Sequence, residues 1–190
     1  YFGKTLTGQR SIFWGQPESQ SSIGIFGLSN SGKSTLINNI ILQAQDMGYE
    51  VFVISDKARV DFKNTTITRI DPQNDETLLR EFIQNMNLKM DSIKKEIEQS
   101  QHSHAKYVSP IKTLVIVDEL WSINHLDKEI RKNFELLIEK IIRQGRYLSV
   151  NLILATQISR VSEASIPLRQ CSIILSGKTD TAELSKSLFD

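Results

Sequence analysis

Apolar residues fall into short continuous runs that alternate with longer stretches of helical spacing. The short runs predict buried strands at 22–26, 51–55, 67–70, 114–117, 150–155 and 172–176. Apolar positions three and four apart predict helices over 33–48, 75–100, 127–144 and 179–189, with a polar loop over 101–110. Strands that are apolar throughout and alternate with helices predict an α/β fold, in which a mostly parallel central sheet carries helices on both faces.

Length and composition predict one domain over residues 1–190, with a polar lead-in segment at 1–22 that holds a short strand at 11–14. The chain has 23 basic and 22 acidic side chains, so its net charge does not indicate which class of partner it binds. Cys171 is the single cysteine, which excludes a disulfide framework, and its apolar surroundings predict a buried thiol. No apolar run reaches membrane-spanning length, and we expect no signal peptide. Because the chain begins at Tyr1 rather than Met, we expect it to be part of a longer protein.

The segment between the first predicted strand and the first predicted helix has the pattern G-x-x-x-x-G-K-[ST]. Its residues are Gly27, Leu28, Ser29, Asn30, Ser31, Gly32, Lys33 and Ser34, followed by Thr35. A loop of this type presents backbone N–H groups and a helix N-terminus to a phosphate chain. Lys33 can then reach the β- and γ-phosphates, and the Ser34 hydroxyl can ligate Mg²⁺. The alternative is a Gly- and Ser-rich turn without a ligand.

Two acidic residues, Asp118 and Glu119, follow the predicted strand 114–117. Acids at the tip of a buried strand are costly unless they meet a cation or a reacting water. Asp118 is therefore predicted to hold Mg²⁺ together with Ser34, and Glu119 to act as the general base that orients and deprotonates the attacking water. The alternative is a helix N-cap followed by a first-turn acid.

Gln157 follows the predicted strand 150–155. If that strand lies between the acid-bearing strand and the phosphate-loop strand, Gln157 faces the γ-phosphate as a sensor; otherwise it is a surface glutamine. Phosphoryl transfer also gains roughly 10³–10⁵ in rate from an arginine of a neighbouring subunit. The candidates are Arg143, Arg146 and Arg169, and Arg146 ranks first because it lies at a helix end beside a Gly turn. Each of these arginines has the alternative of a solvated surface position.

Basic residues are in excess over one part of the chain. Residues 128–169 hold eight Lys or Arg and four Glu. This excess could line a pore for a polyanion, and a solvated face is an equal alternative.

The order of these features is similar to that of the motor domain of FtsK/SpoIIIE-type DNA translocases, in the FtsK–HerA group of P-loop ATPases. Besides the phosphate loop, the matching segments are Gly3–Gly8, Ser55–Lys57, Asp118–Glu119, Arg143–Arg146, Asn151–Gln157, Ile166–Arg169 and Ser176–Asp180. The strongest match is the Arg-x-x-Gly pattern followed by an apolar strand that ends in Ala-Thr-Gln. Ile158 and Ser159 stand where the family often has Arg-Pro.

The resemblance implies a RecA-like motor that binds ATP and Mg²⁺ at subunit boundaries of a ring, usually a hexamer. It implies DNA as the transported polymer, and a type VII-like protein-secretion ATPase of the same fold is the alternative. A nucleotide-binding regulatory module that hydrolyses little is a third class. We expect a cytoplasmic location, at the membrane face if the longer protein is anchored, without direct membrane contact from this segment.

Overall fold

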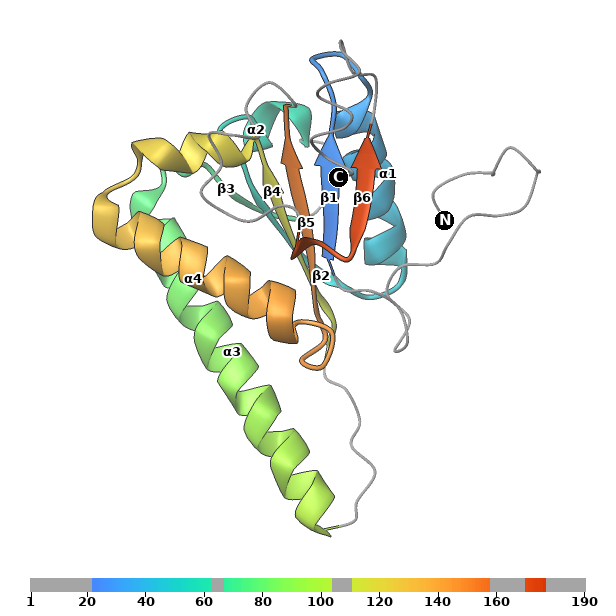
Figure 1. Ribbon diagram of the computed structural model, residues 1–190, viewed down its shortest axis with the longest axis vertical. Coiled ribbons are helices and arrows are strands. Elements are labelled where there is room, and N and C mark those ends of the chain that lie inside the picture. The colour runs from blue at the N-terminus through green and yellow to red at the C-terminus, as the bar shows by residue number, and fades with distance from the viewer. Residues whose placement is uncertain (1–21, 63–66, 104–110, 158–169, 177–190) are drawn as a thin grey trace, which may run out of the picture.

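A parallel sheet forms the centre of the computed structural model, which describes residues 22–62, 67–103, 111–157 and 170–176 (Figure 1). Within these ranges the strands are β1 (Ser22–Phe26), β2 (Glu50–Ile54), β3 (Thr68–Ile70), β4 (Thr113–Asp118), β5 (Val150–Thr156) and β6 (Ile173–Ser176). Their order across the sheet is β3-β2-β4-β5-β1-β6, and every neighbouring pair is parallel. The six strands expected from the apolar runs are therefore confirmed to within a few residues at their ends. The expected strand at 11–14 and helix at 179–189 lie outside the described residues.

The described helices are α1 (Lys33–Asp46), α2 (Ala58–Asp61), α3 (Glu76–Ser103), η1 (Leu120–His125) and α4 (Lys128–Gln144). Helices α1, α3 and α4 confirm three of the helices predicted from the apolar spacing. Helix α3, however, continues to Ser103, into the segment expected to be a loop. Helix α1 ends at Asp46, two residues before the predicted end, and Met47 is 58% exposed just beyond it. None of the helices in the described ranges is long and apolar enough to cross a membrane.

Helices cover both faces of the sheet, as expected, and each face has its own core. Figure 1 shows α3 and α4 crossing one face while α1 lies on the other. The α1 and α2 side buries Ile23, Ile25, Ile37, Ile41, Val53, Phe62, Ile116 and Ile153. The α3 and α4 side buries Phe26, Ile54, Leu79, Met90, Val117, Phe134, Ile138 and Leu154. Cys171, just before β6, is buried as expected, and burial raises the pKa of its thiol to about 12.

Strand β5 lies between the strand that precedes the phosphate loop and the strand that precedes the acidic pair. Its Thr156 is opposite Phe26 of β1, and its Ala155 is opposite Asp118 of β4. The sheet order thus confirms the arrangement that would bring Gln157 beside both motifs. Because the strands are parallel, all three segments leave the sheet at the same edge.

Gly145 joins α4 to β5 at a point where there is no room for a side chain. A Cβ here would overlap the carbonyl oxygens of Ile141 and Val150, which are backbone atoms of the helix end and the strand start. We therefore expect Gly145→Ala to destabilise the chain by about 2–3 kcal/mol and to lower Tm by roughly 4–12 °C in thermal unfolding. Gln144→Ala, a substitution of an exposed neighbour, is the control and should stay within about 0.5 kcal/mol of the parent. Equal melting of the Gly145→Ala variant and the parent would contradict this packing.

Candidate functional site

The N-terminus of α1 has none of the features that usually neutralise a helix start. Gly32 is its N-cap, at a φ of 88° that favours glycine, and α1 has neither a side-chain cap nor an acidic residue in its first turn. By contrast, α4 is capped by Asp127, whose carboxylate accepts from the Glu129 backbone N–H at 2.9 Å. A shallow pocket of about 300 Å³ lies at the start of α1, lined by residues 30–35. The helix dipole and first-turn N–H groups of α1 therefore suit an anion at this pocket.

Lys33 folds back over its own loop. Its ammonium donates to the carbonyl oxygens of Gly27 at 3.0 Å and Leu28 at 3.2 Å. The hydroxyl of Ser31 is buried and has no hydrogen-bond partner among the described residues. A phosphate chain in this loop would replace the carbonyls as the partner of Lys33 and would offer Ser31 an acceptor.

Asp118 is directed to the α1 side of the sheet because side chains alternate along β4. Asp118 lies two and four residues after Ile116 and Leu114, which pack on the α1 side, so its side chain shares their face of the sheet. It is only 3% exposed. Burial, followed by the charge of Glu119, raises the pKa of Asp118 to about 7; Asp61 also raises it, and Lys33 lowers it. A buried carboxyl among other carboxylates is a position that a divalent cation stabilises.

Glu119 adopts a left-handed backbone conformation, with φ at 56° and ψ at 61°, directly after β4. A residue other than glycine in this region costs roughly 1–2 kcal/mol, and such strain is frequent at functional sites. Its side chain is 5% exposed and makes no capping bond to η1; instead it accepts from Gln157 Nε2 at 3.1 Å. The alternative, a helix N-cap followed by a first-turn acid, does not describe the pair, because Glu119 itself stands at the N-cap of η1, without a side-chain capping bond, and the first turn of η1 holds no acid. The structure brings together the two side chains expected to act as base and sensor.

Ser34 and Asp118 supply oxygen atoms of the kind that Mg²⁺ prefers, so the donor set fits this metal. The structure adds a residue that the sequence analysis missed. Asp61, the last residue of α2, lies 3.5 Å from the Ser34 hydroxyl, measured from Oδ2 to Oγ. The available signal was its position: Asp61 follows β2, whose carboxyl end lies at the same edge of the sheet as the phosphate loop.

Two of the three arginine candidates, Arg143 and Arg146, lie far from the phosphate loop of their own chain. Arg143 and Arg146 lie at the end of α4 and just before β5, so they are at the amino edge of the sheet, opposite the loop that follows β1. Arg143 is 68% exposed and lies 3.6 Å from Glu139. This position leaves only a role in trans open to either residue, and Arg169 lies outside the described residues.

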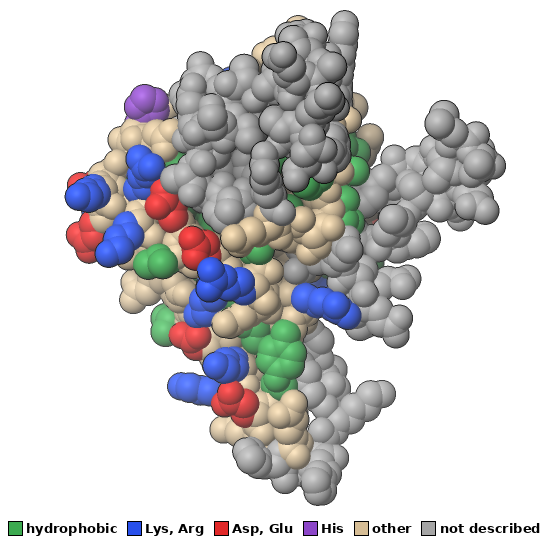
Figure 2. Space-filling model, in the orientation of Figure 1, with side chains coloured by type: hydrophobic (Ala, Val, Ile, Leu, Met, Phe, Trp, Pro, Cys, Tyr) green, Lys and Arg blue, Asp and Glu red, His purple; other side chains and the backbone are tan. Residues whose placement is uncertain are grey.

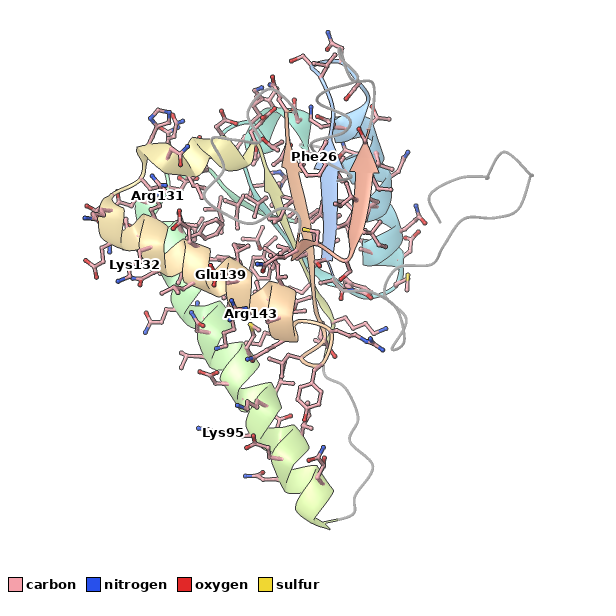
Figure 3. All side chains as sticks on the ribbon, in the orientation of Figure 1. Phe26, Lys95, Arg131, Lys132, Glu139 and Arg143 are labelled. Atoms are coloured by element: carbon pink, nitrogen blue, oxygen red, sulfur yellow. The ribbon has the colours of Figure 1, made fainter. Side chains whose placement is uncertain are left out.

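In the described part of the segment 128–169, which is 128–157, acidic side chains lie between the basic ones. Figure 2 shows Lys and Arg side chains alternating with Asp and Glu over α3 and α4, and Figure 3 shows Arg131, Lys132, Glu139 and Arg143 along α4. The ion pairs on these helices include Arg131–Glu135, Lys140–Asp91 and Arg143–Glu139. This arrangement is typical of a solvated face rather than of a pore lined with positive charge alone.

Comparison with solved structures shows which proteins share this fold. The cytoplasmic domain of EssC has a TM-score of 0.75 at 19% identity, covering 100% of this chain and 39% of that chain. The pCW3 conjugation coupling protein TcpA, with ATPγS, has a TM-score of 0.70 at 17% identity, covering 88% of this chain and 51% of that chain. The genome packaging NTPase B204 of Sulfolobus turreted icosahedral virus 2 has a TM-score of 0.52 at 18% identity, covering 90% of this chain and 80% of that chain.

These likenesses show the fold, which is the RecA-like α/β fold of P-loop nucleotide hydrolases. The chain spans about half or less of the length of the EssC and TcpA structures. No curated protein sequence matches it. A family model described as 50S ribosome-binding GTPase matches residues 22–146, which is more than half of the chain. The chain therefore belongs to the P-loop nucleotide-hydrolase family that this model describes, and it has a RecA-like fold.

Proposed function

We propose that the chain is the ATP-hydrolysing motor domain of an FtsK-like DNA translocase that requires Mg²⁺. One observation carries the proposal: the phosphate loop, the buried acidic pair and Gln157 meet at one edge of the sheet, with Gln157 donating to Glu119 at 3.1 Å. This is the arrangement that hydrolysis of a triphosphate needs, because the water, its base and the γ-phosphate must be held together.

Each side chain has a defined task in the proposed reaction. Lys33 and the loop amides hold the phosphates, and Ser34 and Asp118 would hold Mg²⁺. When bound, this ion neutralises charge on the β- and γ-phosphate oxygens. Glu119 orients a water and takes its proton as the water oxygen bonds to the γ-phosphorus and the bond to the ADP oxygen breaks. Arg146 of a neighbouring copy would stabilise the charge that develops.

The bond between Gln157 and Glu119 supports a link between nucleotide state and the base. The carboxylate of Glu119 accepts from the Gln157 amide in the structure. A γ-phosphate would attract that amide, and a water could then take its place as a donor to the carboxylate. Gln157 would thus report the γ-phosphate and release the base in the same movement.

The transported polymer is proposed from the resemblance in Arg143–Arg146 and Asn151–Gln157 to DNA translocases. The likeness to a conjugation coupling protein and a genome packaging NTPase supports DNA. The likeness to EssC, and to an EccC structure in complex with a signal sequence peptide, supports the alternative of a polypeptide. In either case we propose a ring, usually a hexamer, in the cytoplasm or at the cytoplasmic face of the membrane.

A second candidate function is GTP hydrolysis, favoured by the family model over residues 22–146. One set of assays separates the candidates: steady-state hydrolysis of ATP and of GTP with Mg²⁺, alone, with double-stranded DNA, and with an unfolded polypeptide. We expect ATP to be preferred and its hydrolysis to rise several-fold with DNA. A preference for GTP, or stimulation by polypeptide alone, would overturn the proposal. Lys33→Ala is the control, since hydrolysis by this chain should disappear with it.

A further inference from the structure

Asp61 is held against the first turns of α1 by two contacts. Its carboxylate lies 3.5 Å from the Ser34 hydroxyl, and its backbone carbonyl accepts from the Asn38 side-chain amide at 3.1 Å. Ser34 and Asn38 are one turn apart on the same helix, so they fix Asp61 along the helix start. Both loop side chains thus have partners in the structure: Lys33 donates to loop carbonyls, and the Ser34 hydroxyl lies beside Asp61.

Helix α2 presents Asp61 from an anchored segment. Ala58 and Phe62, at its two ends, are completely buried against the α1 side of the sheet. The Phe62 carbonyl accepts from the Arg69 guanidinium of β3 at 3.2 Å. Arg59, within α2, pairs with Asp75 at 2.9 Å. The carboxylate of Asp61 is therefore held in place from both ends of a short helix.

Acidic side chains gather at this edge of the sheet. Among the described residues, the Asp61 carboxylate lies beside the Ser34 hydroxyl, and Asp118 and Glu119 are buried at the carboxyl end of β4. A free triphosphate is itself highly negative, so it meets repulsion from these carboxylates. The same triphosphate with a divalent cation meets attraction.

We propose that Asp61 is a positioning residue that makes nucleotide binding depend on Mg²⁺: its carboxylate, beside Asp118, selects the Mg²⁺ complex of the nucleotide over the free nucleotide and orients the Ser34 hydroxyl for the metal. The inference rests on the proposed function, since it gives this acid a role in the same site. It also accounts for the position of α2, a four-residue helix packed against the start of α1.

The test is the metal dependence of nucleotide affinity in the Asp61→Asn variant. The asparagine keeps the size of the side chain and an oxygen that can accept from Ser34, but removes the charge. Kd of a fluorescent, non-hydrolysable ATP analogue is measured by anisotropy with saturating Mg²⁺ and with EDTA. We expect the ratio of the EDTA value to the Mg²⁺ value to fall about tenfold in the variant, because one unit charge near the phosphates is removed. Affinity in EDTA should become tighter, which a purely structural role would not produce.

Asp46→Asn is the matched control, because it removes one acidic charge at the exposed far end of the same helix. Its ratio should equal that of the parent, and thermal melts should show that both variants are folded. An unchanged ratio in Asp61→Asn, or equal weakening with and without Mg²⁺, would overturn the inference. A parent chain that binds the analogue equally with Mg²⁺ and EDTA would also overturn it. A parent that binds no nucleotide would instead refute the proposed function.

Discussion

Replacing Glu119 with Gln is expected to lower the rate of ATP hydrolysis by roughly 10²–10⁴-fold while leaving ATP affinity close to that of the parent. The amide has the size of the carboxylate, and its oxygen can still accept from Gln157, so the local structure should persist. What is lost is the basic atom that takes the proton of the attacking water. Single-turnover hydrolysis of labelled ATP, with binding measured separately by equilibrium titration, gives the two quantities.

Glu135→Gln is the control for this variant. Glu135 is a glutamate of α4 that pairs with Arg131 at 2.8 Å on the opposite side of the sheet from α1. Its replacement should leave turnover unchanged. If Glu119→Gln hydrolysed ATP as fast as the parent, Glu119 would not be the base and the proposed hydrolysis mechanism would fail; slow hydrolysis by both would indicate a nucleotide-binding regulatory module.

Asp118→Asn is expected to stabilise the nucleotide-free chain at pH 8. The pKa of Asp118 is about 7 in the folded chain, against an ordinary value of 3.8. As pH rises, the carboxyl of Asp118 therefore loses its proton in the unfolded chain before it does so in the folded chain. The contribution of this group to the free energy of unfolding is complete below about pH 4 and is lost as pH rises through 7. At pH 8 the parent carries a buried charge that costs no more than about 4 kcal/mol, and asparagine carries none. The variant should melt several degrees higher in EDTA at pH 8.

The same variant should lose at least about tenfold in affinity for ATP when Mg²⁺ is present, because a carboxylate that would hold the cation is gone. Thermal melts from pH 4 to pH 8 and titrations with Mg²⁺ measure the two effects on one sample. The exposed Asp46→Asn variant should follow the parent in both measurements. An Asp118→Asn variant that melts below the parent at pH 8 would show that the carboxyl is needed for stability rather than for the metal.

The sheet and its long helices were predictable because their signals extend over many residues. An apolar run such as 114–117 has no polar face, so it predicts a strand covered on both sides, and β4 is buried along its whole length. The phosphate loop was predictable because its backbone conformation and chemistry require particular residues, Gly32 and Lys33 among them. The position of Gln157 was predicted only on the condition that its strand lies between the other two, and the order β4-β5-β1 meets that condition.

Short and conformational features were not predictable. Helix α2 and η1 are too short to show helical periodicity, so Asp61 passed unnoticed although it follows a strand at the functional edge. The left-handed conformation of Glu119, and its bond to Gln157, depend on contacts between β4 and β5 that no local pattern encodes. The extra turn of α3 to Ser103 reflects the polar sequence there, in which apolar spacing no longer marks the helix end.

The most direct test of the account is a crystal structure of the chain with Mg²⁺ and a non-hydrolysable ATP analogue. We expect the Lys33 ammonium to leave the carbonyl oxygens of Gly27 and Leu28 for the phosphates, and Ser34 and Asp118 to hold the metal. Density for the analogue elsewhere, with Lys33 still bonded to its own loop, would contradict it.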